Sequence, residues 1–200
     1  VEESEYTRYL NEMSIGQLVK KYSDFIRWPI VMDGMRMEQV DTGEKDENGE
    51  PVIGVVYDPN HRELFHALRG HGAWLNDAPI RPHPATTVRE GVMGVGTSHR
   101  VTPADFLPFL QALLSDGGMF IRNGSGALMS AWAAAGRLIG YYEPHMNPWD
   151  ALPGLVLMRE AGGASNDFLA QEGIQRGNPL LLASQTLYPQ LKKMIPQPLH

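Results

Sequence analysis

Two carboxylates flank one short segment of the sequence, YYEPHMNPWD. Glu143 ends a run with the composition of a strand, and Asp150 stands at the start of a run with the composition of a helix. In α/β sheets, ligands bind where strands end and helices begin. One carboxylate at such a place can hold a divalent cation that bridges a phosphate and a water molecule, and a second can accept hydrogen bonds from substrate hydroxyls. Magnesium suits this chemistry because it prefers hard oxygen ligands and retains bound water.

A glycine-rich turn in RNGSGAL is the second candidate for chemistry. Gly124, Ser125 and Gly126 would let the backbone N–H groups of a helix start approach a ligand closely. Ser125 between two glycines also has the form of a nucleophile turn, but the sequence places no histidine and aspartate beside it. We therefore expect Ser125 to face a ligand and not to act as a nucleophile.

Asp150 also has a purely structural interpretation. It precedes the apolar run ALPGLVLM, so it can be the N-cap of a buried helix, a role worth about 1 kcal/mol. Pro153 would then lie in the first turn, and Gly162 and Gly163 would end the helix. A carboxylate can cap a helix and bind a metal at once, so both interpretations stay open here.

Other polar residues favour structural roles. His61, His66 and His71 recur every fifth residue, which matches neither a helix face nor a strand face. A zinc site is therefore disfavoured, and we expect exposed or loop histidines. Glu160 falls in the last turn of the same apolar helix, where we expect a solvated or salt-bridged side chain.

The elements that position these residues alternate between strands and helices. Residues 52–68 have the pattern of a hairpin turning at DPNHR. Further strands are predicted at residues 91–96, 119–122, 137–143 and 179–184, and helices at residues 102–116, 123–136, 150–161 and 186–194. This alternation predicts an α/β fold for the second half. The proline-marked stretch RPHPATT predicts a boundary between an N-terminal α+β part, residues 1–84, and a C-terminal α/β part, residues 85–200.

Composition and charge exclude several classes of protein. The chain has 200 residues, 42% of them hydrophobic, which is typical of a soluble globular protein. A formal net charge of -6 disfavours a nucleic-acid partner, because binding along a phosphate backbone needs a concentrated basic surface. The sequence has no cysteine, which excludes disulfides and thiol catalysis. No run is long and apolar enough to span a bilayer, and VEESEYTRYL is too polar for a signal peptide, so we expect no membrane partner and a cytoplasmic location.

Several motifs resemble the inositol monophosphatase family of magnesium-dependent, lithium-sensitive sugar phosphatases. In chain order they are GEPVIGVVYDP, ELFHALRGHGAWLNDAPI, RNGSGAL, YYE and WDALPGLVLMREAGG. The last of these is the most specific, because tryptophan-aspartate, an apolar helix and glutamate-alanine-glycine-glycine together form that family's second signature.

The resemblance implies a fold and a set of roles. The fold would be a layered α-β-α-β-α sandwich of the sugar phosphatase type, with an antiparallel sheet in the N-terminal part and an α/β C-terminal part. Asp150 would bind Mg2+, Glu143 would contact substrate hydroxyls, and the turn of Gly124, Ser125 and Gly126 would lie against the substrate. The partner would be a small phosphorylated substrate, and the protein would be a homodimer.

The sequence departs from this family before residue 52. The family carries an acidic pair and an aspartate-proline-x-aspartate-glycine-threonine segment that hold its first metal, and we do not find that segment. Asp33-Gly34 is better interpreted as a tight turn, and the dipeptide Glu2-Glu3 is too common to assign. Two hypotheses follow. The first is a magnesium-dependent phosphomonoesterase that hydrolyses a small phosphorylated polyol, such as inositol monophosphate, with metal-activated water. The second is a non-catalytic family member, or a truncated chain without the first metal site, that acts through binding or dimerisation.

Overall fold

The computed structural model describes residues 51–196 and Leu199, which belong to one compact unit, Glu44–His200. The predictions made for Glu2, Glu3 and Asp33 lie outside the described residues. In the described part, no helix is both long enough and apolar enough to cross a bilayer.

An antiparallel sheet opens the described part of the chain. Its strands are β1 (Ile53–Asp58), β2 (Glu63–Leu68), β3 (Ala73–Leu75) and β4 (Ala78–Pro79), hydrogen-bonded in that order. The first two strands form the predicted hairpin, in which Val55 lies opposite His66. Residues with opposite environments alternate along β2, where Phe65 and Ala67 are buried and Leu64 and Leu68 are exposed. One face of this sheet therefore belongs to the core.

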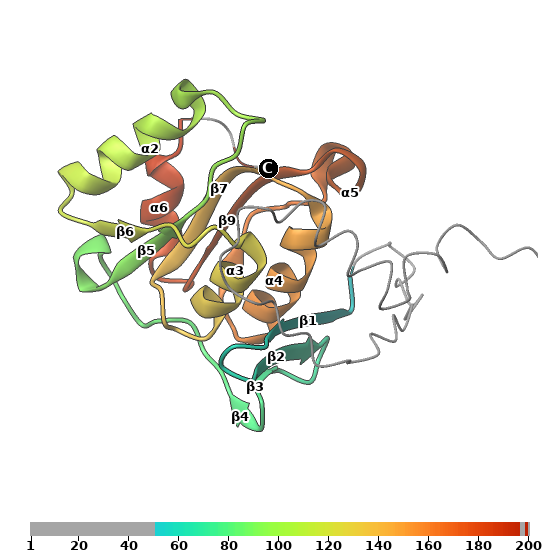
Figure 1. Ribbon diagram of the computed structural model, residues 1–200. Helices are drawn as coiled ribbons and strands as arrows, with labels where there is room; N and C mark the ends of the chain where they lie inside the picture. Colours follow the sequence, from blue (N-terminus) through green and yellow to red (C-terminus); the bar gives the residue numbers. More distant parts are fainter. Residues whose placement is uncertain (1–50, 197–198, 200) are drawn as a thin grey trace, which may run out of the picture. The chain divides into compact units, whose positions relative to one another are not determined.

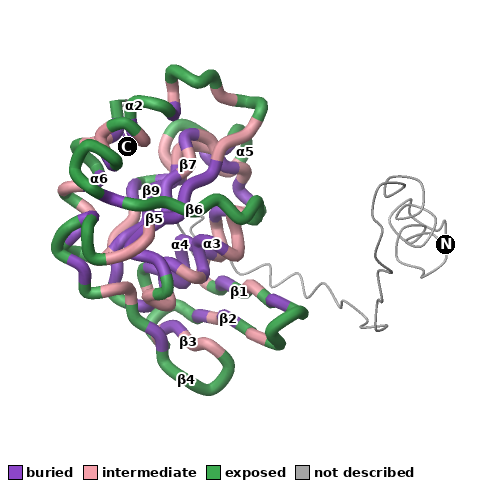
Figure 2. The backbone as a smooth tube through the Cα atoms, turned by 60° about the vertical axis from the view of Figure 1, so that its left-hand side comes forward, coloured by how far each residue is buried: buried purple, intermediate pink, exposed green. Residues whose placement is uncertain are grey.

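A second, mixed sheet forms the centre of the fold. Its strands are β5 (Val92–Val95), β6 (Met119–Ile121), β7 (Gly140–Met146), β8 (Ala164–Ser165) and β9 (Asn178–Ala183). Their order is β6-β5-β7-β9-β8, with β5 parallel to both β6 and β7, and β9 antiparallel to β7 and β8. Figure 2 shows that β7 and β9 are largely buried.

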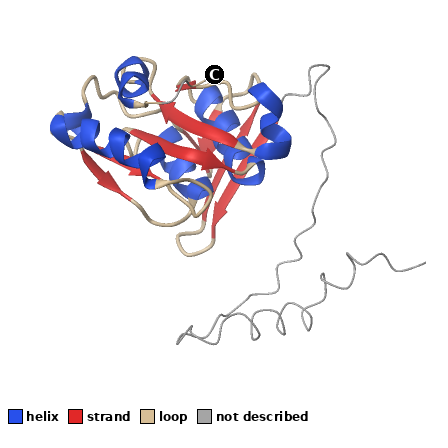
Figure 3. Cartoon of the chain, turned by 90° about the horizontal axis from the view of Figure 1, so that it is seen from above, coloured by secondary structure: helices blue, strands red, loops and turns tan. Residues whose placement is uncertain are grey.

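Helices pack on both faces of the second sheet, as Figure 3 shows from above. They are α2 (Pro103–Ser115), α3 (Gly126–Ala134), α4 (Pro148–Glu160), α5 (Gly173–Arg176) and α6 (Tyr188–Met194), with 3-10 turns η2 (Val88–Glu90) and η3 (Ala170–Glu172). Helices α3 and α4 lie between the two sheets, whereas α2 and α6 cover the other face of the second sheet (Figure 1). The described residues therefore form four layers, and the predicted α/β sandwich is confirmed as the fold class. The boundary between residues 84 and 85 stays a prediction.

The position of α4 between two sheets explains its sequence. Leu155, Val156, Leu157 and Met158 are all buried, because neighbouring layers cover several sides of the helix. Its C-terminal end is also attached to the first sheet, since Glu160 Oε2 accepts hydrogen bonds of 3.0 Å from the backbone N–H groups of Gly70 and Gly72. The expectation of a solvated or salt-bridged Glu160 was therefore wrong: a carboxylate can be satisfied by backbone donors in a turn.

The start of α4 differs from the prediction. The N-cap is Asn147 and Pro148 is the first helical residue, so Asp150 lies inside the first turn and Pro153 lies inside the helix. Proline is favoured at the first helical position because its φ is fixed there and its missing N–H had no partner. Both Asn147 and Asp150 are capping residue types, and Pro148 decides between them.

The expectation of exposed or loop histidines holds for His61 and His71 but not for His66. His61 and His71 are exposed in turns, whereas His66 is half-buried on β2 and bonds to the carbonyl of Asn76 at 3.0 Å. His61 instead lies beside Asp58, with 2.7 Å between Nδ1 and Oδ2.

Asp58, His61 and Glu63 form a group of potential metal-ligating atoms within 4.8 Å of one another. Asp58 and His61 bind each other, and both carboxylate oxygens of Glu63 accept hydrogen bonds from Arg137. The charges of this group are therefore already compensated by protein side chains.

Candidate functional site

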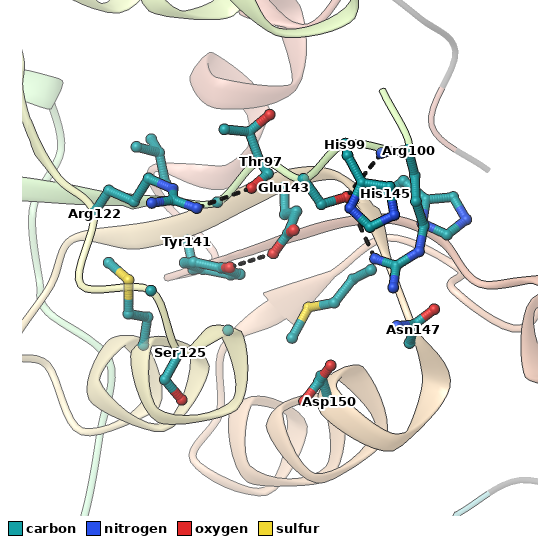
Figure 4. A pocket seen from close by; sticks show the side chains of 17 residues that line it. Thr97, His99, Arg100, Arg122, Ser125, Tyr141, Glu143, His145, Asn147 and Asp150 are labelled. Atoms are coloured by element: carbon teal, nitrogen blue, oxygen red, sulfur yellow. Dashed lines mark hydrogen bonds between the residues drawn. The ribbon is translucent and has the colours of Figure 1, made fainter. Parts of the chain in front are cut away.

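A cavity of about 530 Å3 opens where β5 and β7 end and where α3 and α4 begin (Figure 4). Its wall contains all five positions singled out in the sequence, namely Gly124, Ser125, Gly126, Glu143 and Asp150. These residues come from the start of α3, from β7 and from the first turn of α4. The structure therefore brings the two candidate segments together at one place, while the role of each residue stays a prediction.

The start of α3 borders the cavity with its backbone. Gly124 has φ +95, a left-handed conformation that favours glycine, and the next residue, Ser125, is the N-cap. Ser125 Oγ accepts a hydrogen bond of 3.3 Å from the N–H of Leu128, while the Ser125 N–H donates to Asn123 Oδ1 at 2.9 Å. Within the described part of the chain, no histidine bonds to the Ser125 hydroxyl. Ser125 therefore lacks the base that a nucleophilic serine needs.

Glu143 reaches the cavity from inside β7 and not from its end. The strand continues to Met146 because Glu143 pairs with Leu180 and Met146 pairs with Asn178 on β9, with an irregular register between them. The predicted loop between Glu143 and Asp150 is therefore wrong, since Asn147 alone separates β7 from α4.

The side chain of Glu143 has a fixed partner in the structure. Tyr141 Oη donates a hydrogen bond of 2.6 Å to Glu143 Oε2, shown as a dashed line in Figure 4. Burial raises the pKa of Glu143, and the negative charge of Asp150 raises it further. The Tyr141 hydrogen bond and the positive charge of Arg122 act in the opposite direction. The cavity wall therefore contains a half-buried carboxylate whose burial disfavours its charge.

Asp150 is half-buried at the other side of the same cavity. Burial raises its pKa, and the positive charge of Arg100 partly offsets this effect. No group in the described part of the chain donates a hydrogen bond to its carboxylate, and the neighbouring N-cap residue Asn147 makes no side-chain capping bond either. Two hard oxygen donors thus remain available beside the cavity, as a cation site requires.

Sequence reasoning missed the basic side chains of the wall. Arg100 donates to Ser98 Oγ at 3.4 Å, and Arg122 donates to the carbonyl of Thr97 at 3.1 Å. Both lie in the cavity wall without an ion-pair partner among residues 51–196. Arg100 follows β5 and Arg122 follows β6. Because ligands bind at the ends of parallel strands, these positions in the sequence could have identified both arginines as candidate site residues.

His145 is a further residue of the wall that the sequence did not indicate. Its Nε2 lies 3.0 Å from the carbonyl of Arg176, and its Nδ1 is buried without a partner in the described part of the chain. With two carboxylates, two guanidinium groups and free backbone donors, the cavity can bind an anionic group and hydroxyls of one small molecule.

Comparison with known proteins adds an independent line of support. The sequence profile of the inositol monophosphatase family matches residues 46–196. The chain is 32% identical to an inositol-1-monophosphatase of Mesorhizobium japonicum, over 77% of this chain and 59% of that protein. It is 36% identical to a protein named Nus factor SuhB of Haemophilus influenzae, over 72% of this chain and 55% of that one. The fold is similar to that of the inositol monophosphatase from Anabaena, with a TM-score of 0.65 and 32% identity, covering 74% of this chain and 61% of the other. The chain thus spans less than two thirds of these relatives.

Proposed function

The chain belongs to the inositol monophosphatase family, and from this premise we propose that the protein is a magnesium-dependent phosphomonoesterase. Its substrate would be a small phosphorylated polyol such as inositol monophosphate. One observation carries the proposal: Glu143 and Asp150 line the same cavity as the backbone turn at the start of α3. A phosphate ester of a polyol needs this combination, because it presents an anion at one end and hydroxyls at the other.

The donor set beside the cavity fits a magnesium ion. Asp150 offers a half-buried carboxylate without a hydrogen-bond donor among the described residues, and the Asn147 amide oxygen stands at the neighbouring helix cap. These are hard oxygen donors, and magnesium completes its coordination with retained water. When bound, the ion would activate a water molecule and compensate the charge that develops on the phosphate.

The other residues would bind and orient the substrate. Glu143 would accept hydrogen bonds from the polyol hydroxyls, because its carboxylate faces the cavity with one oxygen not used by Tyr141. The first N–H groups of α3 and the guanidinium groups of Arg100 and Arg122 would attract the phosphate. Opposite charges in one small cavity would therefore fix both ends of the substrate.

The test is phosphate release from inositol monophosphate by the purified full-length protein. We expect turnover with magnesium, loss of turnover with a chelator, restoration by added magnesium and inhibition by lithium. An aryl phosphate measured in parallel reports on the chemistry at phosphorus without recognition of hydroxyls. Turnover that a chelator leaves unchanged would contradict magnesium dependence.

A second candidate is a non-catalytic family member that acts through binding or dimerisation. Two observations favour it. In the described part of the chain, the cavity has two carboxylates, and one of them is bound to Tyr141. One of the relatives carries the name Nus factor SuhB instead of an enzyme name. A folded full-length protein that hydrolyses none of a panel of sugar and nucleotide phosphates would support this candidate.

The remaining expectations are also proposals. We propose a homodimer, which light scattering after size-exclusion chromatography would detect. We propose that the protein has no nucleic-acid partner, because the net charge is -6. A titration with labelled RNA and DNA at physiological salt tests this directly. We also propose a cytoplasmic location.

A further inference from the structure

Tyr141 and Glu143 lie two positions apart on β7, so their side chains share one face of the strand. This face packs against α3, and Tyr141 is 1% exposed there. The Tyr141 hydroxyl uses one carboxylate oxygen, Oε2, at 2.6 Å. No group in the described part of the chain donates to Oε1. The hydrogen bond therefore divides the carboxylate into one oxygen bound to the protein and one oxygen available to a ligand.

Two glycines make room for this pair of side chains. A Cβ on Gly96, directly after β5, would overlap both Tyr141 Oη and Glu143 Oε2. A Cβ on Gly126 would lie 3.1 Å from Tyr141 Oη and 3.3 Å from Glu143 Oε2. The bonded oxygens thus occupy a narrow slot between the end of β5 and the start of α3. Even a methyl group at position 96 would not fit beside these two oxygens.

We infer that Tyr141 is a positioning residue, which holds Glu143 in one orientation so that Oε1 accepts a hydroxyl of the substrate. This inference rests on the proposed function of the cavity as a site for a phosphorylated polyol. A glutamate without such a bond must be ordered each time a ligand binds, and an ordering cost of this kind weakens binding about fivefold. Tyr141 does not reach the phosphate in this scheme, so it acts on recognition of the polyol and not on the chemistry at phosphorus.

The ionisation of Tyr141 is compatible with this role. Burial raises the pKa of its hydroxyl, and the neighbouring charge of Glu143 raises it further. The hydroxyl therefore stays protonated and remains a donor throughout the pH range in which a phosphatase is assayed.

The test compares two neighbouring tyrosines. Tyr141→Phe removes the hydroxyl that binds Glu143, whereas Tyr142→Phe removes a buried hydroxyl without a partner in the described part of the chain. Tyr142 points to the opposite face of the sheet, where the centroid of its ring lies 4.4 Å from the ring centroid of Phe109 on α2. For Tyr141→Phe, we expect KM for inositol monophosphate to rise about fivefold and kcat to change less than twofold. The preference for inositol monophosphate over an aryl phosphate, as the ratio of kcat/KM values, should fall by a similar factor. Tyr142→Phe should leave that preference unchanged.

Equal loss of activity toward both substrates in Tyr141→Phe would overturn the inference, because a general structural defect would then explain it. A double substitution gives the second criterion. In a Glu143→Ala background, which leaves Tyr141 no carboxylate to orient, Tyr141→Phe should add less than twofold to KM, since its effect passes through Glu143. A full additional fivefold increase would also overturn the inference.

A measurement without turnover separates this inference from the proposed function. The hydrogen bond from Tyr141 lowers the pKa of Glu143. NMR titration of the Glu143 carboxyl should therefore show a higher pKa in Tyr141→Phe, which lacks this bond, than in the unsubstituted protein. The Tyr142→Phe variant should not change it. A protein without phosphatase activity, but with this change, would sink the proposed function and leave the positioning of Glu143 supported. An unchanged pKa in Tyr141→Phe would overturn the inference whatever the activity.

Discussion

Glu143 and Asp150 face one cavity although they belong to different elements, a strand and a helix separated by Asn147 alone. Their negative charges interact, since Asp150 contributes to the raised pKa of Glu143. Two half-buried carboxylates near each other are unfavourable in the absence of a positive charge. Arg122 and Arg100 supply part of that charge, because each lowers the pKa of one carboxyl. A divalent cation would supply the rest, and the following predictions separate the roles of the two acids.

Replacing Asp150 with Asn should abolish magnesium-dependent activity with little loss of stability. Asp150 is not the N-cap, so the substitution removes a first-turn charge worth about 0.3 to 1 kcal/mol and also relieves the burial of that charge. The free energy of unfolding should change by less than about 1 kcal/mol. Activity should fall by more than the roughly 10- to 100-fold expected for a residue that only supports a metal ligand.

Thermal melts with and without magnesium, together with rates, test this prediction. Asp77→Asn is the matched control, since Asp77 is an exposed carboxylate in the turn between β3 and β4. A fully active Asp150→Asn protein would contradict the assignment of Asp150 as a metal ligand.

Replacing Glu143 with Gln should affect recognition of the polyol more than hydrolysis. Gln keeps an acceptor for Tyr141 but removes the charge-assisted hydrogen bonds to substrate hydroxyls, which contribute about 1.5 to 3 kcal/mol each. KM for inositol monophosphate should rise about tenfold or more, with magnesium affinity nearly unchanged. Titration calorimetry with magnesium and kinetics with an aryl phosphate provide the comparison. Weaker magnesium binding and equal loss of both reactions would identify Glu143 as a metal ligand instead.

The sequence was informative wherever a local rule determined the structure. The Thr102-Pro103 start of α2 was predicted, and its cap is closed by Asp105, whose Oδ2 accepts from the Thr102 N–H at 2.8 Å. The hairpin of β1 and β2 was predicted from its strand composition and turn. The five positions in the cavity wall came from strand-to-helix junctions and from the family resemblance.

Long-range pairing explains what the sequence could not provide. The extension of β7 through Met146 depends on Asn178 of β9, which is distant along the chain. The bond from Glu160 to Gly70 and Gly72 likewise joins elements that no local pattern connects. The contact between Tyr141 and Glu143 is different, because a two-residue spacing on a strand already places both side chains on one face.

Stability should depend on pH through Asp58 and His61. The hydrogen bond between them lowers the pKa of Asp58 and raises the pKa of His61 from its ordinary value of 6.5. The contribution of His61 is fully present below pH 6.5 and is lost as the pH rises through its raised pKa. The contribution of Asp58 is present above its ordinary value of 3.8 and is lost as the pH falls through its lowered pKa. Both groups therefore contribute fully to stability between about pH 3.8 and pH 6.5.

Asp58→Asn should therefore lower the free energy of unfolding, measured with urea, more at pH 5.5 than at pH 9. Histidine NMR should show the His61 pKa returning toward its ordinary value in this variant. Asp77→Asn controls for the loss of a surface charge. The same destabilisation at both pH values would assign the effect to the Asn60 N–H, which also bonds to Asp58, and not to His61.

The attachment of α4 to the first sheet through Glu160 should be a measurable part of the stability. Glu160→Ala leaves the N–H groups of Gly70 and Gly72 without their charged acceptor, and hydrogen bonds to charged groups contribute about 1.5 to 3 kcal/mol. Partial access of water to this turn reduces the loss, so we expect about 1 to 2 kcal/mol in urea unfolding. Glu172→Ala is the matched control, because Glu172 forms an exposed pair with Arg176, and exposed pairs contribute about 0 to 1 kcal/mol. Amide hydrogen exchange should accelerate at Gly70 and Gly72 in Glu160→Ala and stay unchanged in Glu172→Ala. Equal destabilisation by the two substitutions, without faster exchange at the two glycines, would show that the Glu160 bonds do not hold the turn between β2 and β3 against α4.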